Sequence, residues 1–509
     1  MDTVRVRFAP SPTGGLHLGG VRTVLFNYLF AKKNNGKFIV RIEDTDQSRY
    51  VQGAEEYIFE CLAWCGIQPD ESVMHGGEYA PYRQSERKKI YADYAKKLVA
   101  NGYAYYAFDT TEEIEAMREK RKAEGSVSLQ YDAGIRMQMN NSLRLLPQET
   151  KALLDANTPY VIRIKIPENE TVTFTDLIRG EIHFENAHVD DKVLLKADGM
   201  PTYHLAVVVD DYLMKITHAF RGEEWLPSAP VHILLWKYLF GLDDMPKWAH
   251  LPLILKPDGN GKLSKRDGDR LGFPVYAMDW ADPITKEITK GFKELGFLPE
   301  AFLNMLALLG WSPGTEIEIF TIEELIAAFS IERVNKAGAK FDFEKAKWFN
   351  QQWINKLPVK NYKFRIKQLF LEKGITLTDD IYFEKVLEMV KERCTLLTDF
   401  YEQAGYFFAA PSAWDVDAVK PKWNEEKNNF FLTFINKIQT IKNYTTTEIE
   451  MLFKELATEK NIKPGELQLP FRIMLVGAKF GPGVFEIAST IGVEETISRI
   501  KNGLKVFDN

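Results

Sequence analysis

The sequence is poor in cysteine, with only Cys61, Cys65 and Cys394 among 509 residues. Three cysteines form neither a disulfide framework nor a four-cysteine zinc site. Cys61 and Cys65 lie four residues apart, a spacing that predicts packing on one face of a helix rather than redox work. This low cysteine content favours a reduced, cytoplasmic protein.

Long apolar runs are also missing. A membrane-spanning helix needs about 18 apolar residues, whereas the longest apolar-rich stretch, Phe302 to Trp311, is interrupted by Asn304 and Gly310. The stretch from Met1 to Arg5 lacks the basic region and apolar core of a secretory signal. We therefore expect neither a membrane segment nor a secretory leader.

The composition that remains is that of an ordinary globular protein, with 45% hydrophobic and 27% charged residues. A chain of this length predicts about three to four domains. The net charge of −6 is unevenly distributed, because residues 331–509 carry +3 and the remainder carries −9. A less acidic C-terminal third is compatible with a polyanionic partner.

The N-terminal pattern predicts a nucleotide-binding type of fold. Residues 4–8 alternate as in a strand, residues 21–29 have helical spacing, and residues 37–42 form a second strand pattern. Strand, glycine-rich turn, helix and strand together predict a right-handed βαβ unit. Residues 87–101 are expected to be helical.

The middle of the chain predicts an insertion between two halves of this fold. Residues 103–200 contain a charged helix at 112–122 and short strands near 161–166 and 193–196. Residues 203–211 form an apolar run that predicts a buried strand ending in two acids. Residues 251–272, rich in glycine, lysine and aspartate, predict a loop, and the pattern beyond residue 295 is almost wholly helical.

The first candidate site is Pro10-Ser-Pro-Thr-Gly-Gly-Leu-His17-Leu-Gly19-Gly20, between the first strand and the first helix. Ligands bind at this end of parallel strands, and helix N-termini favour phosphate. Gly19 and Gly20 allow close approach of a nucleotide to the backbone, and His17 can donate a hydrogen bond to phosphate. The alternative is a glycine turn with a capping histidine.

The second candidate site is Gly259-Asn-Gly-Lys262-Leu-Ser264-Lys265-Arg266-Asp-Gly268. Lysines on a glycine-flanked loop suit a polyphosphate, although an isolated basic loop is more often simply solvated. The 245 positions between His17 and Lys262 leave room for one nucleotide fold with an insertion.

The two sites together resemble the HIGH and KMSKS signatures of class I aminoacyl-tRNA synthetases. HIGH corresponds to His17-Leu18-Gly19-Gly20 and KMSKS to Lys262-Leu263-Ser264-Lys265-Arg266. Further stretches resemble the bacterial glutamyl-tRNA synthetases: Arg7-Phe-Ala-Pro-Ser-Pro-Thr-Gly14, Arg41-Ile-Glu-Asp-Thr-Asp46, Tyr82-Arg-Gln-Ser-Glu-Arg87, Pro201-Thr-Tyr-His-Leu-Ala206 and Arg221-Gly-Glu-Glu-Trp225.

The resemblance implies an α/β fold: a Rossmann-like catalytic domain with an α+β insertion, followed by all-α anticodon-binding domains. The implied divisions are the two catalytic halves at 1–102 and 201–250, an acceptor-stem-binding insertion at 103–200, a KMSKS-loop and stem-contact domain at 251–330, and helical domains at 331–395 and 396–509.

The resemblance also implies roles for individual residues. His17, Lys262 and Lys265 would be catalytic, and ATP would be bound by Pro10, Gly14, His17, Gly19, Gly20, Lys262, Ser264 and Lys265. Glutamate would be bound by Arg7, Ser11, Thr13, Glu43, Tyr203 and Arg221. Without the resemblance, surface ion pairs for the arginines and a core hydroxyl for Tyr203 are the plainer interpretations.

The implied partners are L-glutamate, ATP with Mg²⁺, and tRNA(Glu), and the implied state is a cytoplasmic monomer. Arg393 would contact the anticodon, or it is a solvated helix residue. Some relatives carry a zinc cluster near an aromatic run; here that run, Tyr103 to Phe108, has no cysteine, so no metal is expected. Val207 stands where the family often has asparagine.

Several alternatives remain at this point. A glutaminyl enzyme would have C-terminal β-barrels and usually Pro-Glu-Pro at residues 10–12. A tRNA-modifying glutamyl transferase would lack an anticodon domain, and a nucleotidylyltransferase would not bind tRNA. A catalytically dead tRNA-binding protein conflicts with the intact His17, Lys262 and Lys265. A non-discriminating enzyme would also charge tRNA(Gln).

Overall fold

The computed structural model describes residues 3–126 and 128–507. The chain forms two compact units. The first comprises Met1–Glu294 with Pro299–Phe343, and the second comprises Leu295–Leu298 with Glu344–Asn509. Each unit has its own buried core, and the α/β class with a helical C-terminal part is confirmed.

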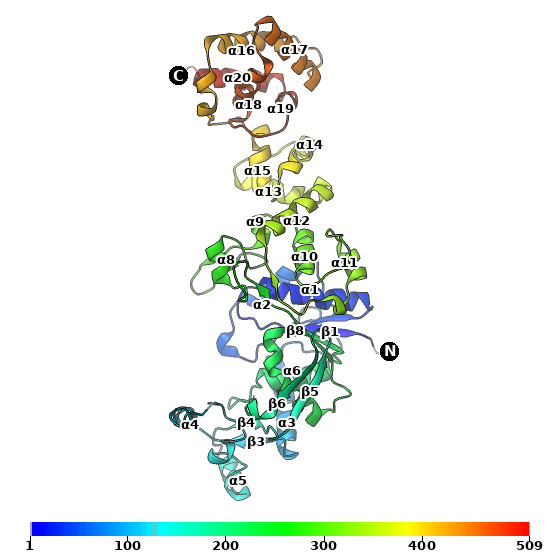
Figure 1. Cartoon of the computed structure of the whole chain (residues 1–509), viewed down its shortest axis with the longest axis vertical. Helices are drawn as coiled ribbons and strands as arrows, with labels where there is room; N and C mark the ends of the chain where they lie inside the picture. Colours follow the sequence, from blue (N-terminus) through cyan, green and yellow to red (C-terminus); the bar gives the residue numbers. More distant parts are fainter. Residues whose placement is uncertain (1–2, 127, 508–509) are drawn as a thin grey trace. The chain divides into compact units, whose positions relative to one another are not determined.

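A six-stranded sheet organises the first unit (Figure 1). Its strands, in spatial order, are β2 (Lys37–Val40), β1 (Arg5–Phe8), β8 (His218–Gly222), β9 (Lys247–Leu251), β5 (Thr171–Asp176) and β6 (Gly180–Glu185). All neighbours are parallel except β5 and β6, which form an antiparallel hairpin. The predicted βαβ unit is confirmed, since α1 (Leu18–Lys33) joins β1 to β2.

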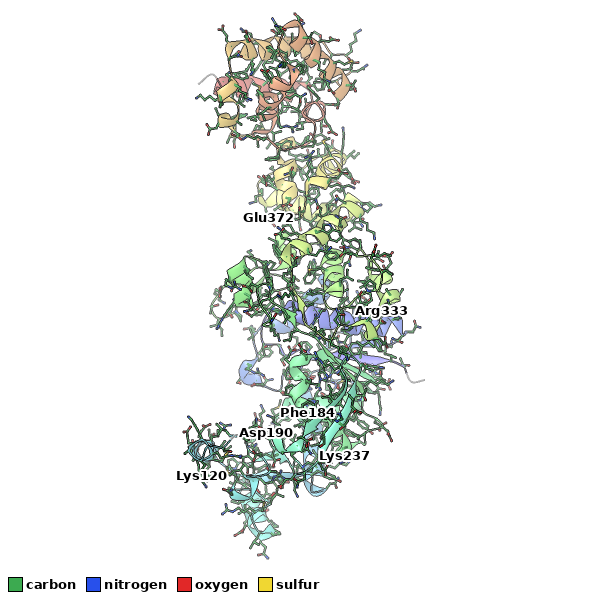
Figure 2. All side chains as sticks on the ribbon, viewed as in Figure 1. Lys120, Phe184, Asp190, Lys237, Arg333 and Glu372 are labelled. Atoms are coloured by element: carbon green, nitrogen blue, oxygen red, sulfur yellow. The ribbon has the colours of Figure 1, made fainter. Side chains whose placement is uncertain are left out.

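The predicted insertion divides into two parts in the structure. The charged helix α4 (Thr111–Ala123), α5 (Pro147–Asp155) and a separate sheet of β3 (Ala104–Ala107), β4 (Val161–Ile164) and β7 (Val193–Leu195) form one part. The β5–β6 hairpin instead extends the main sheet beyond β9. Phe184 of this hairpin packs against the core that contains α7 (Ala229–Leu239), and Lys237 lies on α7 (both labelled in Figure 2).

The predicted strand at residues 203–211 is wrong, because these residues form the helix α6 (Tyr203–Leu213). This helix packs against α3 (Lys88–Ala100) and α7. Residues Leu205–Asp211 are all buried, so the helix has no polar face and its sequence lacks the helical period. A short apolar run of this kind cannot be distinguished from a buried strand by pattern.

The prediction of a loop at residues 251–272 is only partly correct. The segment contains the short strand β10 (Ile254–Leu255) and ends in the helix α8 (Lys265–Leu271). The Asp267 carboxylate accepts hydrogen bonds from the Ser264 backbone N–H at 3.1 Å and from its hydroxyl at 2.5 Å. Gly272 ends the helix at φ +76°. Capping of this kind allows a short polar segment to become helical.

The remaining elements of the first unit flank this sheet. They include α2 (Ala54–Trp64), where Cys61 and the following Cys65 are buried, the pair β11 (Trp280–Ala281) and β12 (Ile288–Thr289), and β13 (Ala339–Lys340), which pairs with β10. Its other helices are α9 (Phe292–Leu295), α10 (Pro299–Leu308) and α11 (Ile322–Ala328).

The second unit is helical, as predicted. Its helices are α12 (Phe343–Lys356), α13 (Lys363–Glu372), α14 (Asp380–Val390), α15 (Asp399–Ala404), α16 (Glu425–Ile438), α17 (Thr446–Glu459), α18 (Pro464–Val476), α19 (Val484–Ile491) and α20 (Val493–Phe507). A buried phenylalanine cluster that includes Phe430, Phe453 and Phe471 joins α16, α17 and α18. Within residues 3–126 and 128–507, no helix has the length and apolarity needed to cross a membrane.

Candidate active site

A cavity of about 700 Å³ opens in the first unit. Its walls come from β1 and the turn that follows it, the start of α1, residues 43–46, α6, the end of β8, and residues 252–254 and 262–264. The cavity therefore lies where parallel strands end and a helix begins, the position at which open α/β sheets bind ligands.

Most of the predicted site residues line this cavity. Those that do are Arg7, Pro10, Ser11, Thr13, His17, Gly19, Gly20, Glu43, Tyr203, Arg221, Lys262 and Ser264. Gly14 and Lys265 do not. Gly14 lies in the turn with φ +143°, and Lys265 begins α8 with its Nζ 3.6 Å from Glu287 Oε2. Arg393 is exposed in the second unit, at the end of the short helix η8 (Lys391–Arg393).

His17 caps α1 and leaves one ring nitrogen without a partner. Its Nδ1 accepts a hydrogen bond from the Gly19 backbone N–H at 3.3 Å, and its Nε2 is buried without a hydrogen-bond partner among the described residues. Burial, reinforced by the nearby Lys262, lowers the pKa of His17 to about 4. The ring is therefore neutral at pH 7 and carries its proton on Nε2, where it is a free donor in the cavity wall.

Gly19 provides open space next to this donor. A Cβ on Gly19 would meet only the His17 ring, at 4.0 Å, so the space beside the first turn of α1 is not filled by protein. A ligand can therefore approach the N–H groups at this helix N-terminus, where an anion is favoured.

Lys262 reaches the cavity but is paired. Its Nζ donates to Glu224 Oε1 at 2.5 Å, and both side chains are well exposed, at 54% and 39%. An exposed pair of this kind contributes at most about 1 kcal/mol. A polyphosphate can therefore displace Glu224 from Lys262 at small cost.

Arg7 lies in a buried chain of alternating charges. Its guanidinium contacts Asp211 at 3.1–3.2 Å, and Asp211 also accepts from Arg41 at 2.9 Å. Arg41 is fully buried and donates to Glu43 at 2.9 Å. Burial alone would raise the pKa of Asp211, but the two guanidiniums outweigh it and lower this pKa. The charge of Arg7 is thus balanced within the protein.

Arg221 differs from Arg7 in having only neutral partners. Its Nε donates to His250 at 2.9 Å, and its Nη1 lies 3.1 Å from His232 Nδ1 and 3.3 Å from the Tyr203 hydroxyl. Its Nη2 is buried without a partner, and no carboxylate among residues 3–126 and 128–507 forms an ion pair with it. The guanidinium also lies 4.6 Å from the centre of the Trp248 ring. An uncompensated buried cation strongly favours an anionic ligand.

Two known protein families together match most of the chain. The family described as "tRNA synthetases class I (E and Q), catalytic domain" matches residues 3–348, and the family described as "Anticodon binding domain" matches residues 346–504. The chain is 49% identical to a glutamate–tRNA ligase of Amoebophilus asiaticus, over 99% of this chain and 98% of the relative. It is 50% identical to one of Flavobacterium johnsoniae, over 99% of each. The chain belongs to the glutamate–tRNA ligase family.

Solved structures extend the comparison with this ligase family to the fold. A glutamate tRNA ligase of Elizabethkingia meningosepticum, crystallised in complex with its amino acid, matches with a TM-score of 0.95 and 47% identity. The match covers 99% of this chain and 100% of the other. The predicted resemblance is thereby confirmed at the level of family and fold.

Sequence reasoning missed several residues that line or support this candidate site. Arg41 stands in one of the stretches that resemble the family, and Asp211 ends the segment predicted as a strand. The pairing of Asp211 with both Arg7 and Arg41 depends on α6 being a helix. His232 and His250 lie behind Arg221 and carry no recognisable local pattern. Trp225, 44% exposed, lines the cavity with its ring centre 4.6 Å from that of Tyr203. Val207 also lines the cavity and gives it an apolar patch.

Proposed function

We propose that this protein attaches L-glutamate to tRNA(Glu) for protein synthesis, with the cavity of the first unit as its active site. The observation that carries the proposal is the buried Arg221, a cation whose described partners are all neutral, in a chain of the glutamate–tRNA ligase family. A substrate with a side-chain carboxylate supplies the missing negative charge.

The first step forms an acyl phosphate. An oxygen of the glutamate α-carboxylate attacks the α-phosphorus of ATP, the bond to the bridging oxygen of the β-phosphate breaks, and pyrophosphate leaves. Catalysis of such a step depends mainly on positioning and charge stabilisation. His17 Nε2–H donates to the transferring phosphate, and Lys262 and Lys265 hold the β and γ phosphates once the loop closes.

The second step transfers the glutamyl group. The 2′-hydroxyl of the terminal adenosine of the tRNA attacks the activated carbonyl carbon and the bond from this carbon to the phosphate oxygen breaks. AMP leaves, and its phosphate takes up the hydroxyl proton. No protein nucleophile is required. Arg7, Ser11, Thr13, Glu43 and Tyr203 complete the glutamate pocket, with Glu43 facing the substrate ammonium group.

Mg²⁺ enters with ATP, because this ion binds mainly through substrate phosphates with few protein ligands. Among the described residues, no group of three or more His, Cys, Asp or Glu side chains is arranged to hold a metal. We infer in addition that residues 103–200 bind the acceptor stem, that residues 251–330 contact the stem, and that the helical domains at 331–395 and 396–509 contact the anticodon. The enzyme is proposed to work as a cytoplasmic monomer.

The deciding experiment is ATP–pyrophosphate exchange with glutamate or glutamine, each with and without bulk tRNA. Exchange that requires glutamate and tRNA together supports the proposal and an ordered mechanism. Exchange with glutamine instead of glutamate would move the assignment to a glutaminyl enzyme. No exchange with either amino acid would favour an adenylyltransferase or a tRNA-binding protein. Charging of purified tRNA(Glu) and tRNA(Gln) then separates a discriminating enzyme from a non-discriminating one.

Glu224→Gln is expected to lower KM for ATP by at most about fivefold, because the change releases Lys262 from an exposed ion pair worth no more than about 1 kcal/mol. The measurement is the ATP dependence of pyrophosphate exchange at saturating glutamate and tRNA. An increase in KM for ATP would contradict the assignment of Lys262 as a phosphate ligand that Glu224 restrains.

Arg393→Ala is expected to lower kcat/KM for tRNA(Glu) about tenfold, within the range for one lost base contact. The side chain is exposed on η8, so the fold should tolerate the change. Aminoacylation at varied tRNA concentration measures the effect, and KM for ATP and for glutamate serve as internal controls. Unchanged kinetics would leave Arg393 as a solvated residue.

A further inference from the structure

Each nitrogen of the Arg221 guanidinium can be assigned either a hydrogen-bond partner or none. An arginine side chain has five N–H groups. The Nε–H group donates to His250 Nε2, and Nη1 carries two N–H groups that face His232 Nδ1 and the Tyr203 hydroxyl. Only the two N–H groups of Nη2 lack a described partner. Three N–H groups are therefore held by the protein and two remain for a ligand.

Both histidines accept a hydrogen bond from Arg221 and use their other ring nitrogen in a second hydrogen bond. His250 Nδ1 lies 2.6 Å from Asp176 Oδ2, so this nitrogen carries the proton and Nε2 presents its lone pair to Arg221. Arg221 Nη1 can only donate, so His232 Nδ1 is the acceptor of that bond. His232 Nε2 then carries the ring proton and donates it to His204 Nδ1 at 3.1 Å. Both rings are 1% exposed or less, and neither is among the residues that line the cavity.

The environment also keeps both rings neutral. Burial and the positive charge of Arg221 hold the pKa of His232 well below its usual value. Burial lowers the pKa of His250, and the hydrogen bond to Asp176 offsets this only in part. Had carboxylates occupied these two positions, they would have cancelled the charge of Arg221, as Asp211 does for Arg7.

We propose that His250 and His232 are positioning residues that set the preference for glutamate over glutamine. As neutral acceptors they fix the Arg221 guanidinium without neutralising it, and they direct the Nη2 donors toward the substrate side-chain carboxylate. The α-carboxylate is consumed in the first step, so the side-chain carboxylate is the group that needs this cation throughout. The inference rests on the proposed function of the cavity.

The test replaces each of the two histidines once by asparagine and once by glutamine. A glutamine amide reaches near the position of a histidine Nε2, and an asparagine amide lies near that of Nδ1. His250→Gln therefore keeps an acceptor for Arg221, and His250→Asn keeps only the bond to Asp176. At residue 232 the relation is reversed, because Arg221 binds His232 Nδ1: His232→Asn keeps the acceptor and His232→Gln loses it.

We expect His250→Asn and His232→Gln to raise KM for glutamate about tenfold, the size of one lost hydrogen bond to a charged group. In the same two variants, the ratio of kcat/KM for glutamate to kcat/KM for glutamine should fall. His250→Gln and His232→Asn should stay close to wild type, and KM for ATP should not change. Pyrophosphate exchange with tRNA present measures all four variants, and thermal unfolding checks that each is folded.

A purely structural role gives a different result. The same amide would then be tolerated or harmful at both positions, or KM for ATP would change as much as KM for glutamate, and either result overturns the inference. A wild-type enzyme that does not use glutamate at all would overturn the proposed function as well. A wild-type enzyme that uses glutamate but shows no crossed ranking overturns this inference alone.

Discussion

Arg221→Ala should lower kcat/KM for glutamate about 30- to 5,000-fold, which corresponds to a loss of about 2–5 kcal/mol of transition-state stabilisation. Arg221 is 7% exposed and no described carboxylate balances its charge. After the substitution the substrate carboxylate would be left in a buried site without its cation. The measurement is pyrophosphate exchange at varied glutamate, with ATP and tRNA saturating.

Two further variants give this result its meaning. Arg221→Lys keeps the charge but loses the planar fork and the three fixed hydrogen bonds, so its effect should be intermediate. Lys237→Ala, on α7 with its side chain 52% exposed, is the matched control (Figure 2). It should change kcat/KM by no more than about twofold, which corresponds to less than about 0.5 kcal/mol, as surface substitutions do. A change of that small size at Arg221 would rule out its role as the carboxylate ligand.

His17→Ala should reduce kcat of pyrophosphate exchange about 100- to 1,000-fold and leave KM for glutamate nearly unchanged. The substitution removes a preorganised donor aimed at charge that develops in the transition state, and the expected loss is about 2.7–4 kcal/mol. His17→Gln, which can place an N–H group near the former Nε2, should recover part of this loss.

The pH dependence separates donation by a neutral ring from proton transfer. Burial lowers the pKa of His17 to about 4, so the ring is neutral above about pH 5 and becomes charged only as the pH falls through 4. The ratio of wild-type to His17→Ala rates should therefore stay constant from about pH 6 to 8. A ratio that falls as pH rises through about 6.5 would instead indicate a protonated histidine acting as a general acid.

The sequence predicted the βαβ unit well because each of its elements has a local signal. Residues 5–8 alternate, His17 and the glycines begin a helix, and Asn34 to Gly36 end it. The residues that line the cavity were also reachable, because the turn after β1 and the start of α1 are contiguous in sequence. Lys262 was indicated by its place on a glycine-flanked basic loop, whereas Glu43, Tyr203 and Arg221 came from the resemblance and not from any local pattern.

The errors have equally definite causes. Residues 205–211 of α6 are all buried, so the hydrophobic pattern that would reveal a helix is absent. As a consequence, Asp211 was predicted to end a strand, and its ion pair with Arg7 was not foreseen. The environment of Arg221 depends on His232, His250 and Asp176, three residues from separate elements. Contacts of that kind are set by tertiary packing, which local sequence does not encode.

The β5–β6 hairpin has a consequence for dissecting the enzyme. Asp176, the last residue of β5, binds both the ring and the backbone N–H of His250, yet it belongs to the stretch between the two catalytic halves. Excising residues 103–200 as a cassette, or exchanging them for the equivalent stretch of a distant relative, would remove this support of the proposed amino-acid pocket along with the elements proposed to contact RNA. A transplantable module has to leave residues 171–185 with the recipient sheet, so the boundaries useful for engineering differ from those of a continuous insertion.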